Sequence, residues 1–172
     1  MKKKFVLLTV LLLMIGISVW AADEEPYVVY NDGTLTFYCD NQRSSRGGTT
    51  YDLNGEQTLP QWTNLAESIT KAVFDPSFSN ARPKTTRNWF MGQTNLVDIQ
   101  GLTYLHTSEV TNMVQMFGDC SSLTSLDLSK FDTRKVTSMF ILLPCRICVA
   151  QKRWEENSIR TTKCFPPHGT TS

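Results

Sequence analysis

Four side chains near the C-terminus have the types and spacing of a zinc site. They are Cys145, Cys148, Cys164 and His168, arranged as Cys-x2-Cys-x15-Cys-x3-His. Tetrahedral Zn²⁺ takes four thiolate or imidazole ligands, and a Cys-x-x-Cys pair supplies two of them. The segment between Cys148 and Cys164 lacks strand or helix order, and structural zinc is less expected in an exported chain. The four residues are therefore kept as an alternative metal site, and no cofactor is predicted.

The remaining reactive residue types favour structural roles. His106 occupies the repeat position that Asp132 fills in the next repeat, which is typical of a cap or turn. Cys120 precedes a predicted strand, and no nearby base suggests that it acts as a nucleophile. The sequence contains no phosphate-binding loop and no hydrolase elbow. We therefore predict that the protein is not an enzyme.

These residues belong to a sequence that repeats with a step of about 27 residues. Leu123-Thr-Ser-Leu126-Asp-Leu128 has the form L-x-x-L-x-L, and the equivalent segments are Leu96–Gly101 and Ile69–Phe74. This motif and period are typical of a leucine-rich repeat with one short parallel strand in each unit. Alternation along each strand predicts outward side chains, which are the candidate ligand-binding residues: Lys71, Val73, Asp98, Gln100, Ser125 and Asp127.

The segments that follow the strands have a helical spacing of apolar residues. Val110, Met113, Met116 and Phe117 fall on one face at i, i+3, i+6 and i+7. Their simplest role is core packing. The predicted fold class is therefore α/β, a short leucine-rich-repeat solenoid of parallel strands plus short helices, occupying residues 67–139.

Residues 22–66 are predicted to form an N-terminal β cap and loop. Tyr27–Tyr30 and Thr34–Tyr38 are β-prone runs separated by Asn31-Asp32-Gly33, which predicts a hairpin. Because a repeat array needs a cover for its first unit, we interpret the hairpin as a β-hairpin cap. The stretch from Asp40 to Pro60 reads as a loop, and Trp62–Ser68 as a short helix or turn.

The first 21 residues have the form of a signal peptide. Lys2, Lys3 and Lys4 precede an apolar run from Phe5 to Val19, and Val19-Trp20-Ala21 suits signal peptidase. A permanent membrane anchor is the alternative, but the run is short for a span. The formal net charge of +1 becomes slightly negative when the three lysines are removed. Nucleic acid, and the membrane after cleavage, are therefore not predicted as partners.

The repeat register is lost just after Met139. Continuing the period places charged residues such as Arg153 and Glu155 at apolar positions, which would be costly to bury. Residues 140–172 are therefore predicted to be an irregular tail, disordered or read in a shifted frame.

One segment closely resembles a known family. Val110–Met139 matches the BspA-like leucine-rich repeat of bacterial, Bacteroidetes-type surface proteins, with the form V-T-x-M-x-x-M-F-x-x-C-x-x-L-x-x-L-D-L-S-x-F-D-T-x-x-V. The resemblance implies an exported, cell-surface or secreted binding protein. It also implies adhesion to an extracellular matrix protein of the host or to a bacterial surface protein of a partner cell. The alternatives are an inactive fragment of a longer repeat adhesin and, more distantly, a zinc-binding module.

Overall fold

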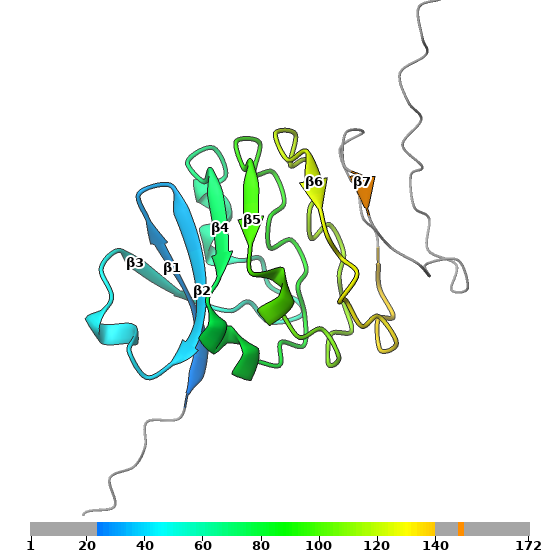
Figure 1. The fold of residues 1–172 in the computed structure, drawn as a ribbon, viewed down its shortest axis with the longest axis horizontal. Coiled ribbons are helices and arrows are strands. Elements are labelled where there is room, and N and C mark those ends of the chain that lie inside the picture. Colours follow the sequence, from blue (N-terminus) through cyan, green and yellow to red (C-terminus); the bar gives the residue numbers. More distant parts are fainter. Residues whose placement is uncertain (1–23, 140–147, 150–172) are drawn as a thin grey trace, which may run out of the picture.

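The computed structural model describes residues 24–139 and 148–149 as a β-rich body (Figure 1). Five strands form one mixed sheet in the order β3-β1-β2-β4-β5. They are β1 (Glu25–Asn31), β2 (Thr34–Asp40), β3 (Thr49–Asp52), β4 (Lys71–Phe74) and β5 (Asp98–Gln100). A separate parallel pair joins β6 (Ser125–Leu126) to β7 (Cys148–Val149). Four 3-10 turns connect the strands: η1 (Arg43–Ser45), η2 (Gln61–Leu65), η3 (Pro76–Asn80) and η4 (Leu102–Tyr104).

The predicted hairpin is confirmed as the antiparallel pair β1–β2. Asp32 and Gly33 form its turn with φ values of 43° and 73°, the left-handed backbone that a tight two-residue hairpin requires. Leu35 and Phe37 are buried, whereas Thr34, Thr36 and Tyr38 lie on the other face. This alternation is that of a strand with one face in the core.

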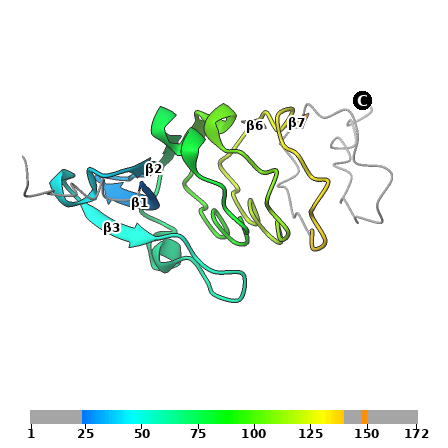
Figure 2. The same cartoon turned by 90° about the horizontal axis from the view of Figure 1, so that it is seen from below.

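From the hairpin onwards the chain runs in successive passes. A pass is one length of chain that lies beside the previous length and pairs with it in parallel. Thr34 in β2 pairs with Lys71 in β4, and Lys71 pairs with Asp98 in β5. The step of 27 residues from Lys71 to Asp98 recurs away from the sheet, where Thr85 pairs in parallel with Asn112, and Asn112 pairs in parallel with Ser138, 26 residues later. Figure 2 shows these passes side by side, with the β1–β3 end on the left. The repeat in the sequence therefore sets the strand register between passes.

The predicted short helix around Val110–Phe117 is wrong. The backbone there makes i to i−3 turns, and Gln115 has a positive φ of 54°. Asp119, just after this segment, and Asn88, one repeat before Gln115, also have positive φ values, both of 59°. Left-handed residues cannot propagate a right-handed helix. Instead the amides of Thr86, Asn88, Phe90 and Gly92 donate to the next pass, to the carbonyls of Asn112, Val114, Met116 and Gly118. The burial of Val110, Met113, Met116 and Phe117 is nevertheless as predicted.

The predicted fold class is wrong as a whole: an α/β leucine-rich-repeat solenoid of parallel strands and helices does not describe this molecule. The described residues contain no α-helix, and the sheet is mixed, because β1 is antiparallel to both β2 and β3. The hairpin supplies two strands of the same sheet, since β2 pairs directly with β4 across the expected domain boundary at residue 66.

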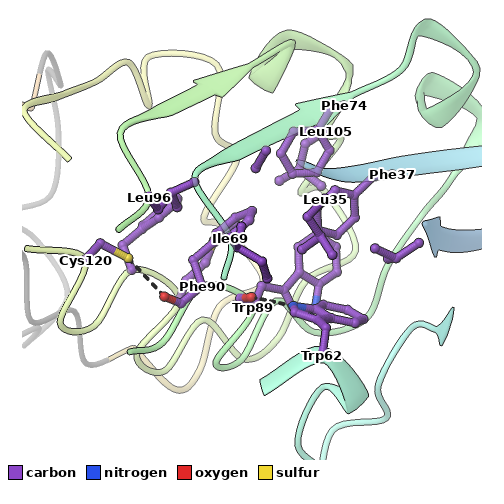
Figure 3. Packing of buried hydrophobic residues seen from close by; sticks show 14 of the residues in the cluster. Leu35, Phe37, Trp62, Ile69, Phe74, Trp89, Phe90, Leu96, Leu105 and Cys120 are labelled. Carbon is purple, nitrogen blue, oxygen red and sulfur yellow. Dashed lines mark hydrogen bonds between the residues drawn. The ribbon is translucent and has the colours of Figure 1, made fainter. Parts of the chain in front are cut away.

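One apolar core lies behind the sheet (Figure 3). Phe37 is at its centre, with ring centroids 4.4 Å from Phe74 and 5.1 Å from Trp89. Ile69, Leu96 and Leu123, the first apolar residues of the three repeats, are all buried in this core. Burial of these equivalent side chains supplies the main stabilisation that holds the passes together.

Two predictions concern segments outside the described residues. The signal peptide, residues 1–21, is one of them, and the tail after residue 139 is the other, apart from the backbone of β7. Within the described part of the chain, no helix has the length and apolar character needed to cross a membrane.

Candidate functional site

Four of the six candidate binding residues, Lys71, Val73, Asp98 and Gln100, lie on the outward face of the five-stranded sheet. In β4 and β5, Lys71 is the register partner of Asp98, and Val73 is the register partner of Gln100. Thr34 and Thr36 of β2 continue the two rows. Ser125 and Asp127 are exposed on the next pass, where Leu126 and Leu128 point inward. The structure therefore brings all six residues onto one side of the molecule, as the alternation predicts. We call this surface, made by Lys71, Val73, Asp98, Gln100, Ser125 and Asp127, the ladder face.

A groove interrupts the ladder face between the β5 pass and the β6 pass. Among the described residues, β5 is the last strand of its sheet, whereas β6 pairs with β7. The groove has a volume of about 540 Å³. Its lining is drawn from both passes: Val97, Asp98, Ile99, Gly101, Leu102, Thr103, Ser125, Leu126, Asp127 and Lys130. Sequence reasoning missed this groove, because both strands carry the same motif and nothing in the motif marks a break in pairing.

Two carboxylates stand in the groove. Asp98 Oδ2 accepts a hydrogen bond from Gln100 Nε2 at 2.7 Å, and Asp127 Oδ1 accepts one from the backbone amide of Ser129 at 2.9 Å. The Ser129 amide bond lowers the pKa of Asp127, so this carboxyl group is ionised throughout the neutral range. Neither carboxylate forms an ion pair with any described lysine or arginine, whereas Asp40, Asp52, Glu109 and Asp132 each do.

Apolar surface adjoins these carboxylates. Val97 is 58% exposed, and the half-buried Ile99 and Leu102 line the same groove. Gly101 shapes the wall, because its φ of 71° turns the chain out of β5. An added Cβ there would lie 2.2 Å from the carbonyl oxygen of Phe74. The groove thus combines negative charge with accessible apolar side chains.

A second hollow, of about 530 Å³, lies at the hairpin end of the molecule and was not predicted. Arg46, from the loop after β2, lies over the ring of Tyr38 at 3.5 Å from its centroid. Arg46 Nε donates to the hydroxyl of Tyr27 at 2.7 Å, and that hydroxyl donates to Asp40 Oδ1 at 2.6 Å. Arg46 also forms an ion pair with Asp40. These four residues anchor the 41–48 loop against the hairpin.

The pKa values in this cluster follow from burial and hydrogen bonding. Burial is the largest influence on the pKa of Tyr27 and raises it. Burial also acts to raise the pKa of Asp40, but hydrogen bonds from Tyr27, the Gln42 amide and Arg46 outweigh it and lower the pKa. The cluster therefore contains a neutral phenol held between an ionised carboxylate and a guanidinium. These paired charges suit a structural role, in which Arg46 holds the 41–48 loop to the hairpin.

Cys39 and Cys120 are buried. Cys120 Sγ donates to the carbonyl oxygen of Phe90 at 3.0 Å, and burial raises its pKa to about 12 (Figure 3). Burial also raises the pKa of Cys39. Both groups are therefore thiols at neutral pH and poor nucleophiles. The predicted structural role of Cys120 agrees with this environment.

The other chemical candidates are placed as follows. His106 is exposed and precedes the turn that begins at Thr107. Of the alternative zinc set, Cys145, Cys164 and His168 lie outside the described residues, and only the backbone of Cys148 lies within them. Residues 24–139 hold no group of three or more histidine, cysteine, aspartate or glutamate side chains that could bind a metal ion.

Together these features define a class: a β-rich protein of stacked chain passes with an outward polar face and a groove. A comparison with family models then gives the family. Residues 64–159, more than half of the chain, match the family described as Mycoplasma protein of unknown function, DUF285, and the chain belongs to this family. Comparisons with curated proteins and with solved structures find no match.

The family match corrects the resemblance drawn from Val110–Met139. No BspA-like or leucine-rich-repeat family model matches the chain. The segment that carries the resemblance lies inside the matched range. The match also extends past Met139 to residue 159, into the segment predicted to be irregular.

Proposed function

We infer that this chain is a non-enzymatic binding protein that is exported and contacts a protein ligand outside the cell through its ladder face. The observation that carries this proposal is the register of the outward side chains. Lys71 and Val73 of β4 align with Asp98 and Gln100 of β5, and Ser125 and Asp127 follow on the next pass. Side chains presented in fixed rows by a packed sheet form a preorganised contact surface, which lowers the entropic cost of binding.

The chemistry of the described side chains supports a binding role over a catalytic one. Cys39 and Cys120 are held as buried thiols, and Asp98 and Asp127 are accessible carboxylates on an open face. The lysine-rich start and apolar run of residues 2–19 support export. The ligand class is a protein, such as a matrix protein or a protein on a neighbouring cell.

Selection from a displayed random-peptide library tests the binding role. The purified chain is the target, and the variant Val73→Arg/Gln100→Arg, which disrupts the ladder face, is used for counter-selection. We expect peptides that bind the wild type and not this variant. A library that yields no such peptides, with both proteins folded by circular dichroism, contradicts the proposal.

A separate measurement tests export. The protein recovered from outside the cytoplasm is analysed by mass spectrometry of the intact chain. We expect a mature protein that begins at Ala22. A protein that keeps Met1–Ala21, or that stays in the cytoplasm, contradicts the export part of the proposal.

A further inference from the structure

We propose that the groove between the β5 and β6 passes binds an extended protein segment in which lysine or arginine side chains alternate with aliphatic ones. This inference rests on the proposed function, because the groove is part of the ladder face. It adds the chemistry of the partner, which the function alone leaves open.

The basic side chains in the partner follow from the unpaired carboxylates. Asp98 and Asp127 both line the groove and form no ion pair with described residues. Glu109, by contrast, is neutralised by Lys84 and Lys135. Among the described residues that line the groove, Lys130 is the one cation, so the two carboxylates leave an excess of negative charge. A cationic partner complements this charge.

The aliphatic side chains follow from Val97. It is 58% exposed at the groove, next to the half-buried Ile99 and Leu102. The binding free energy becomes more favourable when a partner's apolar side chain removes a valine exposed to this degree from water. In the sequence, Asp98 lies between the apolar residues Val97 and Ile99. A partner that matches this stretch therefore alternates the two types of side chain.

The extended conformation follows from the strand geometry. In an extended segment, successive side chains point to opposite sides. A partner in this conformation can therefore match the alternation of apolar and charged side chains along Val97, Asp98 and Ile99. Within the described residues, β5 is an edge strand, and the main-chain groups of an edge strand are a template for an added strand. The volume of about 540 Å³ is enough for several side chains.

The test uses a fluorescein-labelled peptide of alternating lysine and valine, titrated with the purified chain and followed by fluorescence anisotropy. Two matched peptides replace all lysines by glutamate or all valines by serine. We expect binding of the lysine–valine peptide that weakens with added salt. We expect at least tenfold weaker binding of each matched peptide.

Three variants of the chain assign the binding to the groove. Asp98→Asn/Asp127→Asn removes the charge with little change in shape, and we expect at least tenfold weaker binding. Val97→Ser is expected to weaken binding, and Lys130→Gln to tighten it because a repulsive charge is lost. The matched control Glu25→Gln/Asp32→Asn removes two exposed carboxylates at the hairpin and is expected to bind like the wild type.

The outcomes separate this inference from the proposed function. If the lysine–valine peptide fails to bind while library-selected peptides bind the ladder face, the inference is overturned and the function stands. If neither binds, both are overturned. Equal weakening by the groove variant and the hairpin control also overturns the inference, because the attraction is then a general charge effect. Thermal melting of every variant by circular dichroism shows that the fold is unchanged.

Discussion

The indole nitrogen of Trp62 donates a hydrogen bond to the carbonyl oxygen of Trp89, 27 residues later in the chain, over 2.7 Å. Both side chains are fully buried. Trp89 Nε1 in turn donates to Asn54 Oδ1 at 2.8 Å. The two indoles therefore join η2, which carries Trp62, and the preceding loop, which carries Asn54, to the segment around Trp89. This link holds the hairpin half of the molecule to the repeated half.

The first prediction is that Trp62→Phe destabilises the protein by about 2 kcal/mol or more. The substitution keeps an aromatic ring but leaves the buried Trp89 carbonyl without its donor, and a buried unsatisfied polar group costs about 1–3 kcal/mol. The smaller ring also leaves a cavity. Urea unfolding followed by fluorescence measures the change. The control is Tyr104→Phe at an exposed position, and an effect of Trp62→Phe no larger than that of the control contradicts this account of the link.

A pair of glycines gives the second prediction. Gly101→Ala is expected to cost more than about 1 kcal/mol, because an L side chain is strained at positive φ. Its Cβ would also meet the Phe74 carbonyl oxygen at 2.2 Å. Gly47→Ala is the matched control, since nothing lies within 4 Å of a Cβ there, and its effect should stay within about 0.5 kcal/mol. Equal melting temperatures for the two variants would show that the turn after β5 is wrongly described.

The third prediction concerns thiol reactivity. Iodoacetamide at a pH of about 8 should leave Cys39 and Cys120 unmodified in the folded protein, because both are buried and their pKa values are raised. Peptide mapping by mass spectrometry resolves the two sites. Both should react fully in denaturing guanidinium chloride. Rapid labelling of Cys120 in native buffer is inconsistent with its contact with Phe90.

The fourth prediction is a pH dependence at Asp132. Hydrogen bonds from the side chain and the backbone amide of Arg134 lower the pKa of this carboxyl group to about 2. A lowered folded-state pKa stabilises the fold above the ordinary value of 3.8, and this contribution is lost as the pH falls towards about 2. In an NMR titration, Arg134→Met should raise the Asp132 pKa part of the way towards 3.8, because the backbone hydrogen bond remains. An unchanged pKa in the variant would rule out the side-chain contact.

Local sequence signals predicted the hairpin and the register of the passes. Asp32 and Gly33 favour a tight turn, and the alternating residues of β2 identify its buried face. The recurrence of Ile69, Leu96 and Leu123 at one spacing places equivalent apolar side chains in one core. These features could be predicted because each depends on residues that are close in sequence or that repeat at a fixed step.

The backbone between Thr107 and Leu123 could not be predicted in the same way. The spacing of Met113, Met116 and Phe117 fits a helix, but it fits a series of i to i−3 turns equally well. The choice depends on left-handed residues, and the two at Gln115 and Asp119 are not glycines. Gly92, one repeat before Asp119, carries the clearest signal, and Asn88, one repeat before Gln115, carries a weaker one because asparagine tolerates left-handed backbone.

The candidate site was predicted in part. Alternation placed all six ladder-face residues correctly on the outward side. The groove depends on where strand pairing stops after β5, and the Arg46 clamp on how the loop after β2 folds back onto Tyr27. Both are tertiary features that arise between segments with no distinguishing local pattern.

Amide chemical-shift mapping of the isotope-labelled chain, titrated with a peptide from the library selection, tests the central claim most directly. The account predicts that the perturbed amides cluster at residues 97–103 and 125–130, with smaller shifts at Lys71 and Val73. The hairpin loop at residues 41–48 should be unaffected. Shifts confined to that loop, or spread evenly over the molecule, would contradict the claim that the ladder face is the binding surface.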